Sequence, residues 1–427
     1  MKIIKSSQYD LIKSEILSRG DLDYKDINIT VEKIVEDVKQ DGDSAILKYT
    51  KKFDGADLET MEVTKEEIEK AWQRTPQSLK DALTKAGNNI KKFHKKQKRN
   101  SFMDNELRGK ITGQLINPIE KVGIYVPGGK SSYPSTVLMN AIPGKVAGVK
   151  ELIMVTPPGK NGEIMDNILV AAKIANVDRI FKIGGAQAIA GLAYGTQTIP
   201  KVYKITGPGN IYVALAKKQV YGIVDIDMIA GPSEILIIAD KLAKPKYIAA
   251  DLLSQAEHDE LASSVLITPC EKLAEAVSQE VDLQLENLEK KDIAKKSLEN
   301  YGRIIITKNL DEAIDIANEI APEHLELMVA EPFLYINSIK NAGAIFVGEN
   351  TPEPLGDYYA GPNHTLPTNG TAKFSSPLSV DDFIKKTSLI YYSKEALEEV
   401  KDTIVEISDS EGLTAHSNSI KIRFEEA

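Results

Sequence analysis

Four of the five histidines of this chain stand close to a carboxylate and to a turn or helix end. His258 follows the apolar segment PKYIAADLL and comes three residues after Gln255. On a helix these two side chains would share one face, so both could reach the same metal ion. A histidine at the edge of an apolar stripe is more often simply hydrogen-bonded, and glutamine is an uncommon zinc ligand. The segment alone therefore leaves a metal site and a solvated helix end both open.

The other three of these histidines lie far from His258, in irregular segments of the sequence. Imidazoles and carboxylates serve as metal ligands and as general bases. Their concentration in such segments predicts one composite site that collects both kinds of group. The residues are His324 next to Glu323, His364 seven residues after Asp357, and His416 five residues after Glu411.

Glycine-rich turns follow several short apolar segments, and the carboxyl ends of parallel strands are where α/β proteins place ligands. A nicotinamide dinucleotide site usually shows GxGxxG after a strand. The segment GPGNIY offers Gly207 and Gly209, but Tyr212 stands where the third glycine would be. On this motif alone, structural turns are narrowly favoured over a dinucleotide site. The turns are Pro127-Gly128-Gly129, Pro157-Pro158-Gly159, Gly184-Gly185 and Gly207-Pro208-Gly209.

The elements that must position these residues can be predicted from the hydrophobic pattern. From Val122 onward, β-rich segments such as VGIYVPGG and ELIMVTPP alternate with helical patterns, which predicts a parallel sheet with helices on its faces. The alternation resumes beyond Pro245, which predicts a second α/β unit. Residues 1–120 are mostly helical in pattern. The segment between Gly348 and Gly370 has no clear periodicity, which is typical of a functional loop.

The composition is that of an ordinary globular protein. The 427 residues are 42% hydrophobic and carry a net charge of −9, which gives no indication of nucleic-acid binding. No apolar segment approaches the roughly 18 residues that a membrane span needs, and nothing resembles a signal peptide. The single cysteine, Cys270, excludes disulfides within the chain and is expected to be a small buried side chain. We therefore expect a cytoplasmic protein.

Several motifs resemble those of the histidinol dehydrogenases. The segment Ile226–His258, IDMIAGPSEILIIADKLAKPKYIAADLLSQAEH, is similar to the signature segment of that family. The resemblance covers nearly the whole chain, in the order of the family and at its length. It continues through VGIYVPGGKSSYPSTVLMNAIPGKVAGV, GGAQAIAG, GPGNIYVALAK, APEHLEL, GDYYAGPNHTLPT and EGLTAHSNSI.

The resemblance implies an NAD-dependent, zinc-containing oxidoreductase of histidine biosynthesis. Such an enzyme takes L-histidinol through L-histidinaldehyde to L-histidine with two NAD, and holds one Zn²⁺ per subunit. The family's metal ligands fall on Gln255, His258, Asp357 and His416. Its acid/base pair falls on Glu323 and His324.

The resemblance also assigns contacts to the two organic molecules. The NAD contacts fall on Tyr125, Gln187 and Asn210, which reverses the interpretation of the glycine-rich turns given above. The substrate contacts fall on Ser233, Gln255, His258, His324, Asp357, His364, Glu411 and His416.

The implied fold is α/β, with two Rossmann-like parallel-sheet domains, helical N-terminal and C-terminal extensions, and a domain-swapped homodimer whose active sites are shared. His416 would then come from the other subunit. The first domain would comprise residues 22–121 and 235–378, with the zinc and the catalytic residues, and the second, residues 122–234, the NAD side. Residues 1–21 and 379–407 would form the helical extension, and residues 408–427 a tail that reaches the partner's site.

The residue types suit this chemistry. Hydride leaves an alcohol carbon only when the hydroxyl proton is removed, and a neutral histidine such as His324 is a suitable base. The aldehyde must then be hydrated, which Glu323 could assist, while the metal would hold substrate nitrogens as a template. Three alternatives are a related zinc- and NAD-dependent dehydrogenase of another polar alcohol, a zinc hydrolase, and a non-catalytic metal-binding protein. The first should lose Glu411 and His416, the second leaves the NAD contacts unused, and the third predicts no NADH with any alcohol.

Overall fold

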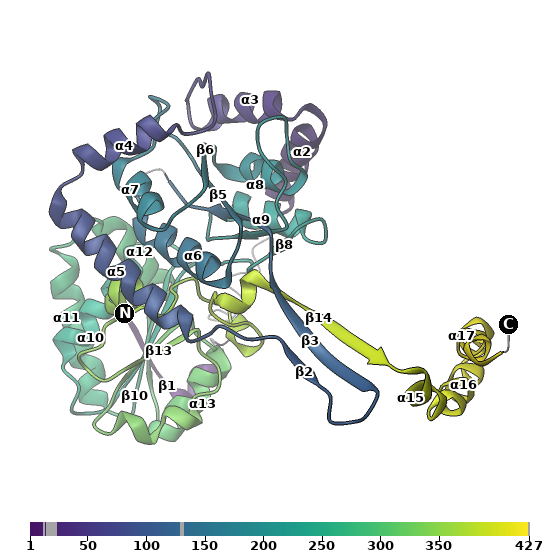
Figure 1. The fold of residues 1–427 in the computed structure, drawn as a ribbon. Helices are drawn as coiled ribbons and strands as arrows, with labels where there is room; N and C mark the ends of the chain where they lie inside the picture. The colour runs from purple at the N-terminus through teal and green to yellow at the C-terminus, as the bar shows by residue number, and fades with distance from the viewer. Residues whose placement is uncertain (12, 14–23, 129–131, 426–427) are drawn as a thin grey trace. The chain divides into compact units, whose positions relative to one another are not determined.

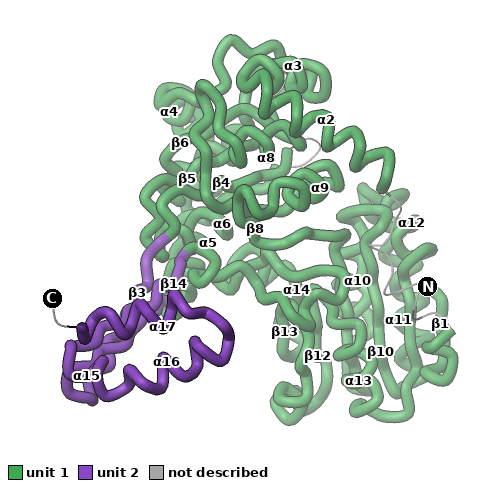
Figure 2. Tube along the Cα trace, turned by 90° about the vertical axis from the view of Figure 1, so that its right-hand side faces the viewer, with its two compact units in different colours: residues 1–97, 119–383 green, residues 98–118, 384–427 purple. Residues whose placement is uncertain are grey.

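The computed structural model describes residues 1–11, 13, 24–128 and 132–425. The chain forms two compact units, residues 1–97 with 119–383, and residues 98–118 with 384–427 (Figure 2). The predicted α/β class with two parallel sheets is confirmed, and a separate antiparallel sheet accompanies them. Gly129 and residues 14–21 of the predicted N-terminal extension lie outside the described residues.

The first parallel sheet has the strand order β6-β5-β4-β7-β8 (Figure 1). A helix follows each of β4 to β7, as the alternating pattern predicted, because parallel neighbours need a crossover connection. The strands are β4 (Lys121–Tyr125), β5 (Glu151–Thr156), β6 (Arg179–Lys182), β7 (Lys204–Thr206) and β8 (Asp225–Ile226), and the helices are α6 (Pro134–Ala147), α7 (Asp166–Ile174), α8 (Gly185–Tyr194) and α9 (Ile211–Val220).

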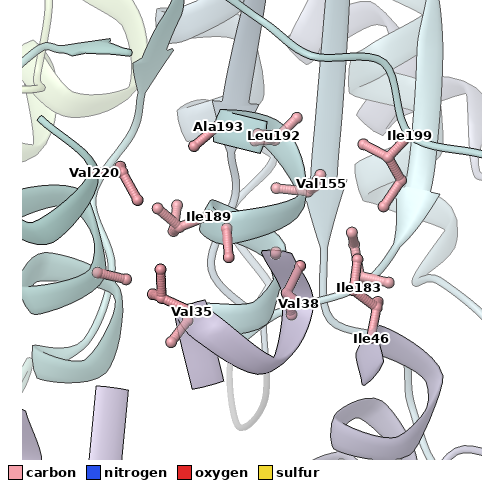
Figure 3. Packing of buried hydrophobic residues seen from close by; sticks show 14 of the residues in the cluster. Val35, Val38, Ile46, Val155, Ile183, Ile189, Leu192, Ala193, Ile199 and Val220 are labelled. Carbon is pink, nitrogen blue, oxygen red and sulfur yellow. The ribbon is translucent and has the colours of Figure 1, made fainter. Parts of the chain in front are cut away.

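Four N-terminal helices complete the layers around this sheet. Successive residues of β5 point to opposite faces, so Val155 packs with α2, α3, α8 and α9, whereas Met154 packs with the helices of the other face. Figure 3 shows the first cluster, in which Val38 and Ile46 lie near Ile189 and Ile183. The predicted grouping of residues 22–121 with 235–378 stays a prediction about domain division. The helices are α2 (Lys25–Asp41), α3 (Asp43–Phe53), α4 (Lys65–Arg74) and α5 (Gln77–Lys95).

The second parallel sheet has the order β1-β11-β10-β9-β12-β13. Its centre, β9, is buried along its whole length, with alternate side chains packed against α10–α12 on one face and α13 on the other. The strands are β1 (Lys2–Lys5), β9 (Glu234–Ala239), β10 (Ser263–Thr268), β11 (Arg303–Ile306), β12 (His324–Met328) and β13 (Ala344–Val347), and the helices are α10 (Pro245–Ala256), α11 (Glu271–Leu285), α12 (Lys291–Tyr301) and α13 (Leu310–Ile320).

Two segments expected to be helical form strands instead. Lys2–Lys5 pairs with β11, and this parallel pairing buries Ile4 against the sheet. Within the predicted helical extension 379–407, β14 (Ile384–Tyr392) forms an antiparallel ladder with β3 (Lys110–Pro118). The β14 segment IKKTSLIYY is rich in β-branched and aromatic residues, which favour strands.

The smaller compact unit consists of this antiparallel sheet and the C-terminal helices. Strand β2 (Phe102–Asp104) completes the sheet on the free side of β3. None of the helices in the described part of the chain has both the length and the apolar composition needed to cross a membrane. The helices are α15 (Lys394–Glu398), α16 (Lys401–Ser410) and α17 (Thr414–Lys421).

Candidate functional site

A cavity of about 320 Å³ lies at the carboxyl end of α10 and the amino end of β12. Its lining comes from segments more than a hundred residues apart in the sequence, because the strand order places β9 next to β12. Seven of the residues predicted to bind the substrate or the metal or to transfer protons line this one cavity, namely Ser233, Gln255, His258, Glu323, His324, Asp357 and His364.

Gln255 and His258 are placed by the last turn of α10. Its apolar side chains pack on the sheet, and the His258 amide donates to the Gln255 carbonyl oxygen at 3.2 Å as the helix ends. Gln255 is only 1% exposed, and its side-chain oxygen has no donor among the described residues. His258 is exposed as a residue, but the surroundings of its ring displace solvent and lower its pKa, which favours the neutral imidazole with a free lone pair. Gln255 therefore offers an unpaired acceptor atom to the cavity, and His258 offers a neutral ring.

His324 is held by one ring nitrogen and presents the other. Its Nδ1 donates to the Glu234 carbonyl oxygen at 2.9 Å, which fixes the ring at the first residue of β12. Its Nε2 lies 3.7 Å from Asp357 Oδ1 and 4.0 Å from Glu353 Oε1, and it forms no hydrogen bond with a described residue. The buried ring thus directs an acceptor or a proton toward the carboxylates.

Glu323 and Glu234 each donate a backbone amide hydrogen bond to the carboxylate of the other. The Glu234 amide donates to Glu323 Oε2 at 2.9 Å, and the Glu323 amide donates to Glu234 Oε2 at 3.3 Å. These two reciprocal hydrogen bonds connect the first residue of β9 with the residue before β12. Burial raises the pKa of Glu323 to about 7, although the charge of His324 opposes the shift.

The long loop supplies Asp357, His364 and a residue that the sequence analysis missed, Glu353. Glu353 begins the short helix α14 (Glu353–Leu355), and its amide donates to Glu326 Oε1 at 2.9 Å. His364 Nδ1 donates to the Asp357 carbonyl oxygen at 3.1 Å. Glu353 stands four residues before Asp357, and this spacing could have indicated that both face the same side of a helical turn.

Three ionisable side chains, those of His324, Glu353 and Asp357, lie close together in the cavity and shift one another's pKa. Ligand atoms of His324, Glu353 and Asp357 lie within 4.8 Å of one another, an arrangement that could hold a metal ion. Burial would lower the pKa of His324, but the neighbouring carboxylates, Glu323 first, more than offset it and raise it to about 10. Burial would raise the pKa of Asp357, but the close approach of His324 Nε2 and the positive charges that both histidines can carry lower it to about 2. Burial, together with the charge of Asp357, raises the pKa of Glu353 to about 8.

The ligand atoms that line the cavity suit a divalent cation. Buried carboxylates need a positive partner, and buried acceptor atoms without donors are uncommon in folded proteins. Gln255 Oε1 is such an atom. Nitrogen and oxygen ligands of these types bind Zn²⁺ and related ions.

A second cavity, of about 600 Å³, adjoins the first at Asn210, which lines both. All three predicted NAD contacts, Tyr125, Gln187 and Asn210, line it. Asn210 Oδ1 accepts from the Tyr212 and Val213 amides at 3.1 and 3.2 Å and so caps α9. Gln187 is 1% exposed, and its side-chain oxygen has no donor among the described residues. A dinucleotide fits these features, because a cavity of this size holds a cofactor and Gln187 still lacks a partner.

The turn between the two cavities is held by a buried ion pair. Lys217 and Asp227 pair directly, and their side chains are 2% and 1% exposed. Lys217 also donates to the Gly207 carbonyl oxygen at 3.1 Å, while Asp227 accepts from the Gly207 amide at 2.7 Å. Gly207 has φ +111°, and a Cβ there would lie 2.1 Å from the Tyr125 carbonyl oxygen. Glycine and the ion pair together fix the turn that carries Asn210.

Glu411 and His416 belong to the other compact unit, after α16 and within α17. Both side chains are exposed there. Their membership of the site therefore stays a prediction.

Comparison with known proteins agrees with these features. The family model for histidinol dehydrogenase matches residues 17–424. The chain belongs to the histidinol dehydrogenase family. A histidinol dehydrogenase of Clostridium acetobutylicum is 57% identical over 92% of each chain, and one of Listeria monocytogenes is 53% identical over 100% of each. The crystal structure of histidinol dehydrogenase from Elizabethkingia anophelis superimposes with a TM-score of 0.93, at 39% identity, over 99% of this chain and 98% of that one.

Membership at this identity makes the protein an oxidoreductase of histidine biosynthesis with histidinol dehydrogenase activity. The family implies NAD, and the possible metal-binding group His324, Glu353 and Asp357 is present in the fold.

Proposed function

We propose that the protein oxidises L-histidinol to L-histidine through L-histidinaldehyde in one site, with two NAD and one zinc ion per subunit. One observation carries the proposal. Seven residues predicted for the substrate, the metal and the proton transfers line a single cavity, which shares Asn210 with the cavity lined by the predicted NAD contacts. NAD, when bound, would accept the hydride that leaves the alcohol carbon.

The proposed metal ligands in this chain are Gln255, His258 and Asp357, with His416 from a second subunit. The unpaired Gln255 oxygen and the neutral His258 ring support the first two, since both offer lone pairs inside the cavity. When bound, zinc would hold the substrate through its nitrogens, which orients the alcohol carbon rather than activating the reacting oxygen.

His324 is the proposed base for the alcohol proton. Because its Nδ1 donates to the Glu234 carbonyl oxygen, the proton must be taken up at Nε2, the atom without a hydrogen bond to a described residue. The nearby carboxylates stabilise the protonated ring and so favour this uptake. A cation bound at Asp357 would reduce the local negative charge, lower the pKa of His324 and free Nε2 for the next proton.

Glu323 is the proposed base for the second step, the attack of water on the aldehyde. A carboxyl group with its pKa raised to about 7 exchanges protons readily at neutral pH. Its oxygen Oε2 lies 3.6 Å from His324 Nδ1, so the two groups act on neighbouring parts of the cavity. The amide of Glu234 holds the carboxylate in place.

We also propose a homodimer in which the C-terminal tail of each chain, with Glu411 and His416, completes the site of its partner. The three predicted ligands within one compact unit leave a coordination position for a further protein ligand. The tail, residues 408–427, belongs to the smaller compact unit, and the prediction of a domain-swapped dimer assigns it to the second subunit.

The first prediction concerns stoichiometry. Purified protein with limiting L-histidinol and excess NAD should form two NADH per histidinol, measured by absorbance, because both oxidations occur in one site. Prior treatment with a chelator should abolish NADH formation, and added zinc should restore it. One NADH per histidinol in the untreated protein, or full activity after verified zinc removal, would contradict the proposal.

The second prediction separates the two oxidation steps. Glu323→Gln should retain most of the rate of alcohol oxidation and lose about a hundredfold or more in aldehyde oxidation, because only the second step needs this base. L-histidinol and L-histidinaldehyde, supplied separately, measure the two rates. Glu331→Gln, which changes an exposed carboxylate beyond β12, serves as the control. Equal losses in both steps would assign Glu323 a structural role instead.

The third prediction tests the shared site. His258→Ala and His416→Ala should each be inactive alone. After random subunit exchange, an equal mixture should regain about a quarter of wild-type activity, since half of the dimers would be mixed and each of these would contain one intact site of two. His258→Ala mixed with Gln255→Ala is the matched control, because both changes lie on the same side of the site and no intact site can form. Absence of activity in confirmed mixed dimers of the first pair would show that each chain completes its own site.

A further inference from the structure

Asp54 is a partly buried acidic residue that the proposed mechanism does not use. It follows α3 directly and lines the 600 Å³ cavity together with Tyr125 and Gln187. Its Oδ2 is closed off from water and has no hydrogen-bond donor among the described residues. Burial raises the pKa of Asp54 to about 6. A carboxylate in this position lacks the partner that buried acceptors normally have.

Asp54 lies across the sheet edge from the residues that would carry out the chemistry. A Cβ atom placed on the next residue, Gly55, would lie 3.6 Å from Lys160 Cγ, so the two residues are close neighbours. Lys160 belongs to the segment that follows β5. Asn210, which leads into the catalytic cavity, follows β7, and β4 separates the two strands. Two strand spacings correspond to about 10 Å. If the nicotinamide lies beside Asn210, Asp54 faces the other half of the dinucleotide.

The groups around Asp54 suit a nucleoside. Phe53 lines the same cavity and is 51% exposed, which leaves an aromatic surface available to a planar base. Lys160, also in the lining, provides a cation that can approach phosphate. An aromatic ring, a carboxylate and an ammonium group in one cavity match the base, the ribose diol and the phosphate of an adenosine nucleotide.

We propose that Asp54 accepts hydrogen bonds from the adenosine ribose of the dinucleotide and thereby selects NAD over NADP. A carboxylate accepts hydrogen bonds from the hydroxyl groups of the ribose diol, whereas a 2′-phosphate removes one donor and adds negative charge beside the carboxylate. The inference rests on the proposed binding of NAD in this cavity. It adds a specificity-determining residue to the three predicted NAD contacts.

The experiment measures binding of NAD and NADP by calorimetry in the absence of histidinol, for the full-length wild type and Asp54→Asn. The amide keeps the size of the side chain and removes its charge. We expect NAD to bind about ten- to a hundredfold more weakly to Asp54→Asn, and the preference for NAD over NADP to fall by at least as much. The KM for histidinol should stay within about twofold of wild type. Asp57→Asn, an exposed carboxylate paired with Lys51 at 2.6 Å, is the matched control and should change none of these values.

A measurement on the wild type alone covers the case in which Asp54→Asn fails to fold. An NAD analogue without the adenosine 2′-hydroxyl should bind the wild type about tenfold more weakly than NAD. Equal binding of the analogue, or an unchanged NAD/NADP preference in a folded Asp54→Asn, would overturn the inference. A wild type that binds NAD selectively but forms no NADH from histidinol would instead contradict the proposed function and leave the inference standing.

Discussion

The burial of several carboxylates around one imidazole is the constraint on which the rest of the site depends. Glu234, Glu323, Glu326 and Glu353 are each less than 10% exposed, and Asp357 stands beside them. Their mutual repulsion inside a protein is tolerated only when protons, backbone amides or a cation offset it. In this structure, backbone amides and raised carboxyl pKa values offset the repulsion. The ligand atoms of the cavity leave a place for a cation.

The protons and amides that offset this repulsion come from three segments that meet at Glu326, namely β12, α10 and the long loop. Burial and the nearby charge of Asp251 raise the pKa of Glu326 to about 9, which favours the protonated carboxyl group at neutral pH. Glu326 lies on β12 and Asp251 on α10, the helix whose last turn carries Gln255 and leads to His258. The amide of Glu353 donates to the same Glu326 side chain and connects the long loop to the strand. The groups that prevent charge repulsion therefore also position the proposed metal ligands.

The sequence predicted the parts of this arrangement that depend on local pattern. The apolar segments of β4 and β5 predicted strands of a parallel sheet, and the i, i+3 spacing of Gln255 and His258 predicted one face of a helix end. The motif resemblance added the distant residues, of which seven line one cavity. Strand β14 was missed although its residue types favour a strand, because it is mostly exposed and its partner β3 is distant in the sequence. Glu353 was missed because its importance comes from burial beside Asp357, and Asp54 because an acidic residue at a helix end is ordinary until its surroundings are known.

Anomalous X-ray scattering measured on both sides of the zinc absorption edge, from crystals of the zinc-loaded full chain, tests the central claim most directly. A peak should lie about 2.0–2.2 Å from the Gln255 side-chain oxygen, a His258 ring nitrogen and an Asp357 carboxylate oxygen. Absence of a peak there, or a peak bonded instead by His324, Glu353 and Asp357, would contradict the proposed ligand set and the catalytic role of His324.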